Sequence, residues 1–256
     1  MSNPTIVFLA GKGNSTNMLY HALKEEFSIA AIILEEPVGK IAFLKKRLKK
    51  LGIRKVTGQV LFQLIAVGIL DLISGKRKKE IMLQQGLENS PLPPEKIIRV
   101  KSVNDIQTIN FLQKISPNLV IVNGTRIISK LVLNCVPADF LNMHAGITPK
   151  YRGVHGAYWA LVNDDAANCG VTIHLVDPGI DTGAVIQQLP ITVTHRDNFV
   201  TYPLLQLSTG IPLLKNAMRT QLQNRLIPVA NTSQGSLWHH PGLFQYLYFR
   251  ICKGKK

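Results

Sequence analysis

Thr5-Ile-Val-Phe-Leu-Ala10, followed at once by Gly11-Lys-Gly-Asn-Ser15, is the stretch that decides the fold. The first six residues form a short apolar run, which indicates a buried strand, and the glycines behind it indicate a tight turn. Residues 16–27 then have apolar side chains at helical spacing. A strand, a glycine turn and an amphipathic helix are typical of a parallel α/β sheet.

The rest of the chain repeats this alternation. Apolar runs predict further strands at 29–34, 97–100, 119–122, 139–143, 171–176 and 184–193. Helical spacing predicts helices at 103–115 and 156–162, and a helix at 199–224 that Pro203 and Pro212 break. The sequence therefore predicts an α/β fold with a doubly wound, mostly parallel sheet and helices on both faces. Ligands of such sheets gather at the carboxyl ends of the strands.

The net charge of +15 is concentrated in two segments. Residues 40–79 hold twelve Lys or Arg and one acid, and the last ten residues hold four more basic side chains. The remainder has as many acids as bases. A basic charge confined in this way indicates a partner surface rather than a property of the fold.

Residues 37–95, an insert that is basic and apolar, interrupt the alternation of strands and helices. Their apolar stretch 56–74 contains Gln59, Gln63 and Asp71. We considered a buried or surface helix with solvated basic flanks and an interfacial helix lying on an anionic membrane. A membrane-spanning helix is disfavoured, because a span needs about 20 predominantly apolar residues.

The chain ends in a basic, aromatic tail. We expect a catalytic domain at 1–225, which includes the insert, and a tail at 226–256. Aromatic residues beside basic ones in 244–256 suit a membrane interface or packing on the body. The two basic segments, 40–79 and 244–256, are therefore candidate contacts with an anionic membrane surface. They would also fit nucleic acid, but no recognition motif accompanies them.

The cysteines and the N-terminus indicate the compartment. Cys135, Cys169 and Cys252 form neither a disulfide framework nor a zinc pattern, and no other set of residues has metal-ligand spacing. The first residues show no signal peptide. We expect a cytoplasmic protein without a metal, placed on the inner face of the membrane if it is peripheral.

Two polar clusters contain the candidate catalytic residues. Asn142 and His144 lie two apart on a predicted strand and therefore face the same side. Asp181 lies in a glycine-rich loop after a later strand. An amine that attacks a formyl carbon generates an oxyanion and loses a proton, and these three side chains suit both needs. On spacing alone, a histidine packed beside a turn and a capping aspartate remain an alternative.

Residues 118–189 resemble the catalytic core of the folate-dependent formyltransferases. That family includes glycinamide ribonucleotide transformylase, methionyl-tRNA formyltransferase and the sugar N-formyltransferases. Asn142-Met-His144 matches the family's catalytic Asn and His, and Ile180-Asp181-Thr-Gly183 matches the loop of the catalytic Asp. The resemblance implies transfer of a formyl group from 10-formyltetrahydrofolate, as co-substrate, to a primary amine without a covalent enzyme intermediate.

The resemblance also implies binding residues. For the folate, they are Asn123, Gly124, Arg126, Ile127 and Ile128, together with Asp177 and Gly179. For the substrate, they are Gly11, Gly13, Asn14, Ser15, Tyr151, Arg152 and Gly153. The sequence at Gly11, Gly13, Asn14 and Ser15 is similar to a phosphate-binding turn, although a plain strand-to-helix turn also explains it.

Departures from the family pattern concern the acceptor. Residues 145–149 read Ala-Gly-Ile-Thr-Pro where many members have Ser-Leu-Leu-Pro, and the insert has no counterpart in the family. The short C-terminal part argues against tRNA as a partner. We expect an amino sugar, linked to a nucleotide or a lipid. The alternatives are glycinamide ribonucleotide and a non-catalytic folate- or nucleic-acid-binding module.

The remaining histidines and Trp159 have no matching motif. His155 and His174 suit the pocket or a structural role equally well. We expect His195, His239 and His240 at the surface and Trp159 in the core. The sequence does not predict the oligomeric state.

Overall fold

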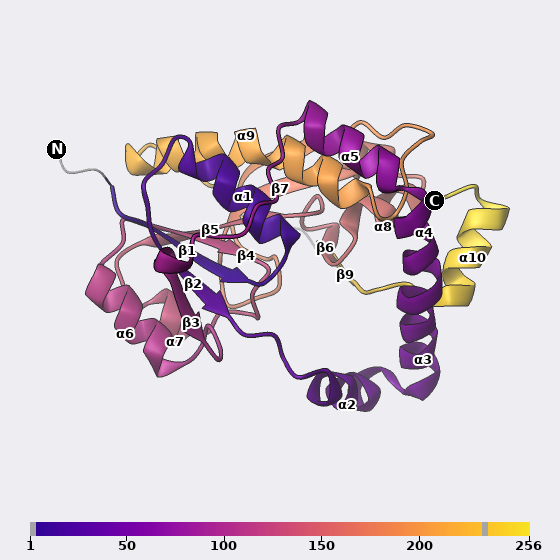
Figure 1. The fold of residues 1–256 in the computed structure, drawn as a ribbon, viewed down its shortest axis with the longest axis horizontal. Coiled ribbons are helices and arrows are strands. Elements are labelled where there is room, and N and C mark those ends of the chain that lie inside the picture. Colours follow the sequence, from indigo (N-terminus) through magenta and orange to yellow (C-terminus); the bar gives the residue numbers. More distant parts are fainter. Residues whose placement is uncertain (1–3, 232–234) are drawn as a thin grey trace.

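A computed structural model describes residues 4–231 and 235–256 (Figure 1). Its central sheet consists of β1 (Ile6–Gly11), β2 (Ile29–Glu35), β3 (Ile97–Val100), β4 (Leu119–Asn123), β5 (Asp139–His144), β7 (Gly170–Leu175) and β8 (Val185–Pro190). Their order is β3-β2-β1-β4-β5-β7-β8. The first five strands are parallel, and β7 and β8 pair antiparallel. The predicted mostly parallel sheet is confirmed.

Helices cover both faces of the sheet. On one face lie α1 (Asn14–Lys24) and α9 (Tyr202–Leu222), and on the other lie α6 (Ile106–Ile115) and α7 (Lys130–Leu133) (Figure 1). Strand β1 shows why, since Ile6 and Phe8 pack with α1 and α9 while Val7 and Leu9 pack with α6 and α7. All four side chains are fully buried. A strand that is apolar on both sides requires a helix layer on each side.

The predicted breaks in α9 are wrong. Residues 202–222 form one helix, with Pro203 in its first turn and Pro212 inside it. Proline suits a first turn, where its missing N–H has no partner to lose. Pro212 is tolerated because the helix buries Ile211, Leu214 and Met218 against the sheet. This burial offsets the hydrogen bond lost at Pro212.

The insert between β2 and β3 is helical. It consists of α2 (Lys40–Leu51), α3 (Ile53–Leu61), the π-helical turn η1 (Phe62–Val67), α4 (Gly68–Ile73) and α5 (Gly75–Gln84), and the 3-10 turn η2 (Pro94–Lys96) follows it. Elements α3, η1 and α4 form one rod, Ile53–Ile73, the only helix of the described residues that is long and apolar enough to cross a membrane. Only 28% of its most apolar stretch is buried.

The C-terminal residues pack against this rod. Strand β9 (Ser236–Trp238) pairs with β6 (Tyr151–Gly153), and α10 (Leu243–Cys252) follows it. Phe62 of η1 contacts Phe199 and Tyr246, with ring centroids 4.9 Å and 5.1 Å away. Trp159 of α8 (Gly156–Val162) joins the same core, as expected, near the 3-10 turn η3 (Ala166–Asn168). The division into residues 1–225 and a tail stays a prediction.

Candidate active site

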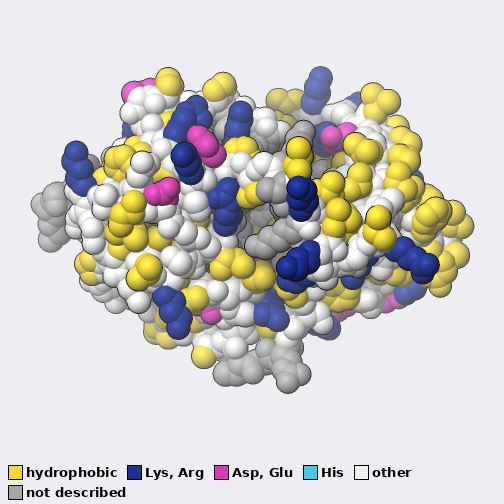
Figure 2. Space-filling model, turned by 90° about the horizontal axis from the view of Figure 1, so that it is seen from below, with side chains coloured by type: hydrophobic (Ala, Val, Ile, Leu, Met, Phe, Trp, Pro, Cys, Tyr) yellow, Lys and Arg dark blue, Asp and Glu magenta, His cyan; other side chains and the backbone are white. Residues whose placement is uncertain are grey.

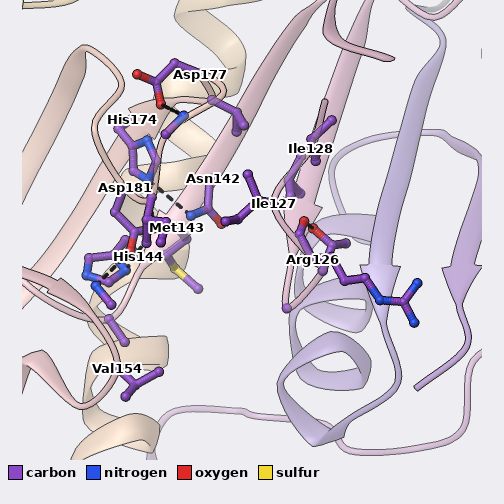
Figure 3. A pocket seen from close by; sticks show the side chains of 18 residues that line it. Arg126, Ile127, Ile128, Asn142, Met143, His144, Val154, His174, Asp177 and Asp181 are labelled. Carbon is purple, nitrogen blue, oxygen red and sulfur yellow. Dashed lines mark hydrogen bonds and ion pairs between the residues drawn. The ribbon is translucent and has the colours of Figure 1, made fainter. Parts of the chain in front are cut away.

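A cavity of about 360 Å³ opens where β4 and β5 end (Figure 3). Asn142, His144 and Asp181 all line it, as the sequence predicts. Figure 3 shows these polar residues on one side of the cavity and Ile127 and Ile128 on the other. Parallel strands bring their carboxyl ends to one edge of the sheet, which explains this meeting of distant segments.

His144 lies between two acceptors. Its Nε2 donates to the carbonyl oxygen of Tyr151 at 2.9 Å, and its Nδ1 lies 3.4 Å from Oδ1 of Asp181. The side chain of His144 is 6% exposed and that of Asp181 is 16% exposed. Because both ring nitrogens face acceptors, the imidazolium form is the one that would donate to both. The pair can therefore hold a proton at the edge of the cavity.

His174 orients Asn142. The two residues lie opposite each other on β7 and β5, and Nδ2 of Asn142 is 3.1 Å from Nε2 of His174. Nδ1 of His174 donates to the carbonyl of Leu175 at 2.7 Å, which leaves Nε2 to accept from Asn142. Burial lowers the pKa of His174, which favours this neutral form. His174 also lines the cavity, which is one of the two roles that the sequence left open for it.

Strand β6 positions the aspartate and the histidine. The amide of Gly153, which lines the cavity, donates to Oδ2 of Asp181 at 2.9 Å. Tyr151 and Arg152, expected at the substrate, have their side chains elsewhere. The hydroxyl of Tyr151 donates to Asp165 at 2.8 Å, and Arg152 donates to the carbonyl of Gly235 at 3.0 Å. Neither Tyr151 nor Arg152 lines the cavity.

Residues 124–128 form the opposite wall. Gly124, Arg126, Ile127 and Ile128 all line the cavity, as expected for a folate-binding segment. Figure 3 shows that the guanidinium of Arg126 points away from it. The guanidinium donates to Oε1 of Glu35 at 2.9 Å, and the Arg126 amide donates to Oε2 at 2.9 Å. Glu35, which the sequence analysis missed, is 6% exposed and also accepts from the amide of Val103 at 2.8 Å.

Asn123 lies outside the cavity, contrary to expectation. Its amide donates to the hydroxyls of Thr16 at 2.9 Å and Ser15 at 3.3 Å, so it ties β4 to α1. The turn after β1 lies at the same edge of the sheet but does not line the cavity. A Cβ on Gly11 would lie 2.2 Å from the carbonyl oxygen of Gly124, so only glycine permits this approach.

The loop after β7 completes the lining. Asp177 and Gly179 both line the cavity, as predicted. The carboxylate of Asp177 accepts from the hydroxyl of Thr182 at 2.8 Å and from the amide of Gly179 at 3.1 Å. These bonds close the loop that presents Asp181, whose φ is +51°. In residues 4–231 and 235–256, no group of His, Cys, Asp or Glu has the arrangement of a metal site.

A flat ring with polar edges fits this cavity. The walls offer apolar side chains of Val122, Met143 and Ile128 beside the backbone of residues 124–128. Small-molecule sites are typically 300–1,000 Å³, mostly apolar, with few placed polar groups. The residues present therefore fit the pterin ring of a folate.

Comparison with known proteins assigns the family. The model of the formyl transferase family matches residues 59–203, more than half of the 256 residues. This chain belongs to the formyl transferase family. The expectation of a formyltransferase is confirmed at the level of the family.

Individual relatives are similar to this chain at low sequence identity. A methionyl-tRNA formyltransferase of Caldanaerobacter subterraneus is 27% identical over 152 residues, 59% of this chain and 46% of that protein. The chain thus spans less than half the length of this curated relative. A sugar N-formyltransferase from a Shewanella species has a TM-score of 0.58 at 14% identity, covering 91% of this chain and 76% of that one.

A second similar structure contains a folate. WlaRD, described as a sugar 3N-formyl transferase in the presence of dTDP and 5-N-formyl-THF, has a TM-score of 0.53 at 20% identity. It covers 93% of this chain and 70% of that one. At these identities the two structural matches confirm the fold. The similarity to a tRNA-directed relative leaves the expected absence of tRNA unconfirmed.

Proposed function

We propose that this chain transfers a formyl group from 10-formyltetrahydrofolate to a primary amine. The observation that supports this best is the convergence of Asn142, His144 and Asp181 on one cavity whose opposite wall suits a pterin. The folate supplies the formyl carbon, which the amine nitrogen attacks. The carbon–nitrogen bond to N10 breaks, N10 takes up a proton, and the products are a formamide and tetrahydrofolate.

Each of the three side chains has its own role in the proposed reaction. The amide of Asn142, held by His174, donates its second N–H to the oxyanion that develops on the formyl oxygen. His144 in its imidazolium form stabilises the same charge. Asp181 faces Nδ1 of His144 and accepts, directly or through water, the proton that the amine loses. No side chain becomes acylated, so the reaction needs one direct transfer.

The proposed acceptor is an amino sugar, linked to a nucleotide or a lipid. The altered loop 145–149 and the similarity in fold to sugar N-formyltransferases support this choice. Binding contacts are proposed for residues 124–128, Asp177 and Gly179 on the folate side and for Gly153 on the acceptor side. An anionic membrane is proposed to meet segments 40–79 and 244–256, which would place a cytoplasmic enzyme at the inner face of the membrane.

Glycinamide ribonucleotide is the second candidate acceptor. The observation that favours it is the start of α1, where Gly13 is the N-cap and provides no side-chain cap. Amides at a helix N-terminus favour phosphate, so Gly11, Gly13, Asn14 and Ser15 are proposed to bind the phosphate of such an acceptor. An amino-sugar nucleotide would use the same amides for its diphosphate.

The test is formyl transfer to a panel of amines. The panel contains amino-sugar nucleotides, glycinamide ribonucleotide and methionyl-tRNA, and release of tetrahydrofolate is followed. Wild type is compared with His144→Ala and with His195→Ala, a matched control at an exposed histidine. Turnover that only His144→Ala abolishes supports the proposal and names the acceptor. A chain that binds no folate and turns over no amine contradicts it.

A further inference from the structure

Two neighbouring helices expose apolar side chains that no described part of the chain covers. On the rod Ile53–Ile73 and on α10, which contact each other, the exposed large hydrophobic residues include Leu64, Ile69, Leu72, Phe244, Tyr248 and Ile251. We call these six residues the apolar face. Figure 2 shows hydrophobic side chains gathered at this end of the molecule. Soluble monomers rarely expose extended apolar patches without a function.

The apolar face is built on rigid packing. Behind it, the rings of Phe62 and Tyr246 lie 5.1 Å apart and both are buried. A Cβ on Gly58 would lie 3.6 Å from the Cα of Gly242, so the two helices approach closely. Within α10, Phe244, Tyr248 and Ile251 recur at helical spacing on one side. The exposed residues therefore form the outer side of the rod and α10, and the inner sides of these two helices pack in the core.

Exposed basic side chains lie on α2 and on the first turn of the rod. Lys45, Lys49, Lys50, Arg54 and Lys55 are exposed, and in the described parts of the chain none of them forms an ion pair with an acid. Other cations of the insert and tail do have partners, as Arg77 has with Asp197 and Lys255 with Asp164. The exposed acid of the rod, Asp71, is neutralised by Lys78 at 2.8 Å. Lys and Arg beside an apolar helix face are complementary to anionic lipid.

We propose that the apolar face docks on the surface of an anionic lipid bilayer, with the rod and α10 lying along it. This rests on the proposed function and deepens it, since the acceptor is then an amino sugar presented on a membrane lipid. Docking buries the six apolar side chains in the interface and leaves the five cations at the level of the headgroups. The occupant is thus a membrane rather than another protein surface, because it satisfies both the apolar and the basic part.

The contacts of the rod exclude a spanning orientation. Its buried side includes Phe62 and Gln59, whose amide donates to the carbonyl of His240 at 2.7 Å. Moving the rod across a bilayer would strip these contacts and place Gln59, Gln63 and Asp71 in hydrocarbon. Lying on the surface keeps every one of them. The helix therefore serves as a docking element of a folded protein.

The apolar face is joined to the active site by a short framework. His240 lies between β9 and α10, and its Nδ1 is 2.9 Å from Nε2 of His155 and 2.9 Å from Nε2 of Gln63. His155 follows Val154, which lines the cavity, and Gly153, which holds Asp181. A membrane docked on the rod and α10 thus lies at a fixed position relative to the catalytic loop. An amine attached to a lipid would be delivered from that side.

Co-sedimentation with vesicles tests the docking. Wild type is mixed at low salt with vesicles of equal parts phosphatidylglycerol and phosphatidylcholine, and with phosphatidylcholine alone. We expect binding to the anionic vesicles that added salt weakens. Leu64→Glu and Leu72→Glu, at side chains 72% and 83% exposed, should each weaken binding about tenfold or more. Lys49→Gln and Lys50→Gln should each weaken it about fivefold.

A control variant tests whether vesicle binding depends on the apolar face. Ile106→Glu, on α6 at a side chain 64% exposed, is the matched control and should bind like wild type. Circular dichroism should be unchanged in all variants, because every substituted side chain is exposed. Absence of wild-type binding, or equal binding of Leu64→Glu, overturns the proposal. So does a dimer in sedimentation velocity that Leu64→Glu dissociates, or protein that resists extraction from membranes by alkaline carbonate.

The two proposals fail separately. Transfer to a soluble amine in the absence of vesicles measures the chemistry alone. Transfer without vesicle binding would overturn the docking and leave the proposed function standing. Vesicle binding by a chain that binds no folate and transfers formyl to no amine would support the docking and contradict the proposed function.

Discussion

Asp181 connects three groups of the site through one carboxylate. Oδ1 lies 3.4 Å from Nδ1 of His144 and 3.8 Å from Nε2 of His174, while Oδ2 accepts from the amide of Gly153. The loop around it is closed by Asp177 and Thr182. The carboxylate is thus fixed in place before any substrate arrives, which is what electrostatic stabilisation of a transition state requires.

Replacing the charge of Asp181 while keeping its shape isolates its role. In Asp181→Asn the side-chain oxygen can still accept from the amide of Gly153, so the fold should persist. The imidazolium of His144 loses its counter-ion, and the proton of the amine loses its acceptor. We expect kcat to fall roughly 10²–10⁴-fold with KM for the folate little changed. Release of tetrahydrofolate measures both constants.

The control for Asp181→Asn is Asp139→Asn, at an exposed position on the far end of β5. It should leave kcat unchanged. If Asp181→Asn kept kcat within a few-fold of wild type, Asp181 would only position the loop. The proton of the amine would then need another acceptor.

Among the secondary-structure elements, the rod Ile53–Ile73 is part of the hydrophobic core. Its π-helical turn brings Phe62 against Phe199 and Tyr246. Every four or so residues the rod buries one side chain, and the side chains between them face solvent. The same rod therefore anchors the insert and presents the apolar face.

Phe62→Ala should show this anchoring. Phe62 is fully buried, so its truncation removes apolar contacts and leaves a cavity. We expect a loss of about 3–5 kcal/mol in the free energy of unfolding. Leu64→Ala, two residues along but exposed, should change it by less than about 0.5 kcal/mol. Urea denaturation of the two variants measures the contrast, and similar small losses would mean that the insert folds apart from the body.

The contact between His155 and His240 predicts acid sensitivity. Burial lowers the pKa of His155 to about 3 and that of His240 to about 4, from 6.5. The neighbouring His240 adds to the lowering of the His155 pKa, and Arg47 and His239 add to the lowering of the His240 pKa. Below pH 6.5 the unfolded chain binds protons that the folded chain does not. Stability should therefore fall as pH drops from about 6.5 to about 4, by at most about 1.4 kcal/mol per pH unit for each histidine.

Urea denaturation between about pH 7 and pH 5 measures this slope. His240→Gln should make the slope shallower, because one of the two buried neutral groups is gone. His195→Gln, at an exposed histidine, should leave it unchanged. A wild-type protein whose stability is constant over this range would contradict the prediction.

The expectation that His240 lies at the surface is wrong, since it bonds with His155 and Gln63.

For the whole molecule, local patterns predicted the layers but not how distant segments meet. Apolar runs located the strands, most clearly β1 and β4, because a strand buried on both faces has no polar alternation to obscure it. The antiparallel pairing of β7 with β5 was not predicted, since direction depends on the path of the chain between them. Strands β6 and β9 are three residues each, too short for periodicity to show.

The site follows the same division. That Asn142, His144 and Asp181 meet at one cavity was predictable because they lie in motifs at the ends of strands, and their roles stay predictions. The directions of the Tyr151, Arg152 and Asn123 side chains were not predictable, because a motif gives the residue but not the direction of its side chain. Glu35 escaped prediction because its partners Val103 and Arg126 are more than 60 residues away in sequence.

Glu35 links local opening of the sheet edge to the wall of the cavity. One buried carboxylate holds the end of β2, the amide of Val103 and the wall of the cavity at Arg126. Opening of the sheet edge at β3 must then release residue 126, and a ligand on that wall must oppose the opening. Binding of 5-formyltetrahydrofolate should slow amide hydrogen exchange at Val103, outside the cavity lining, and Glu35→Gln should weaken this protection. Unchanged exchange at Val103 would show that the edge opens independently; slowed exchange would make the far strand of the sheet a reporter of the folate.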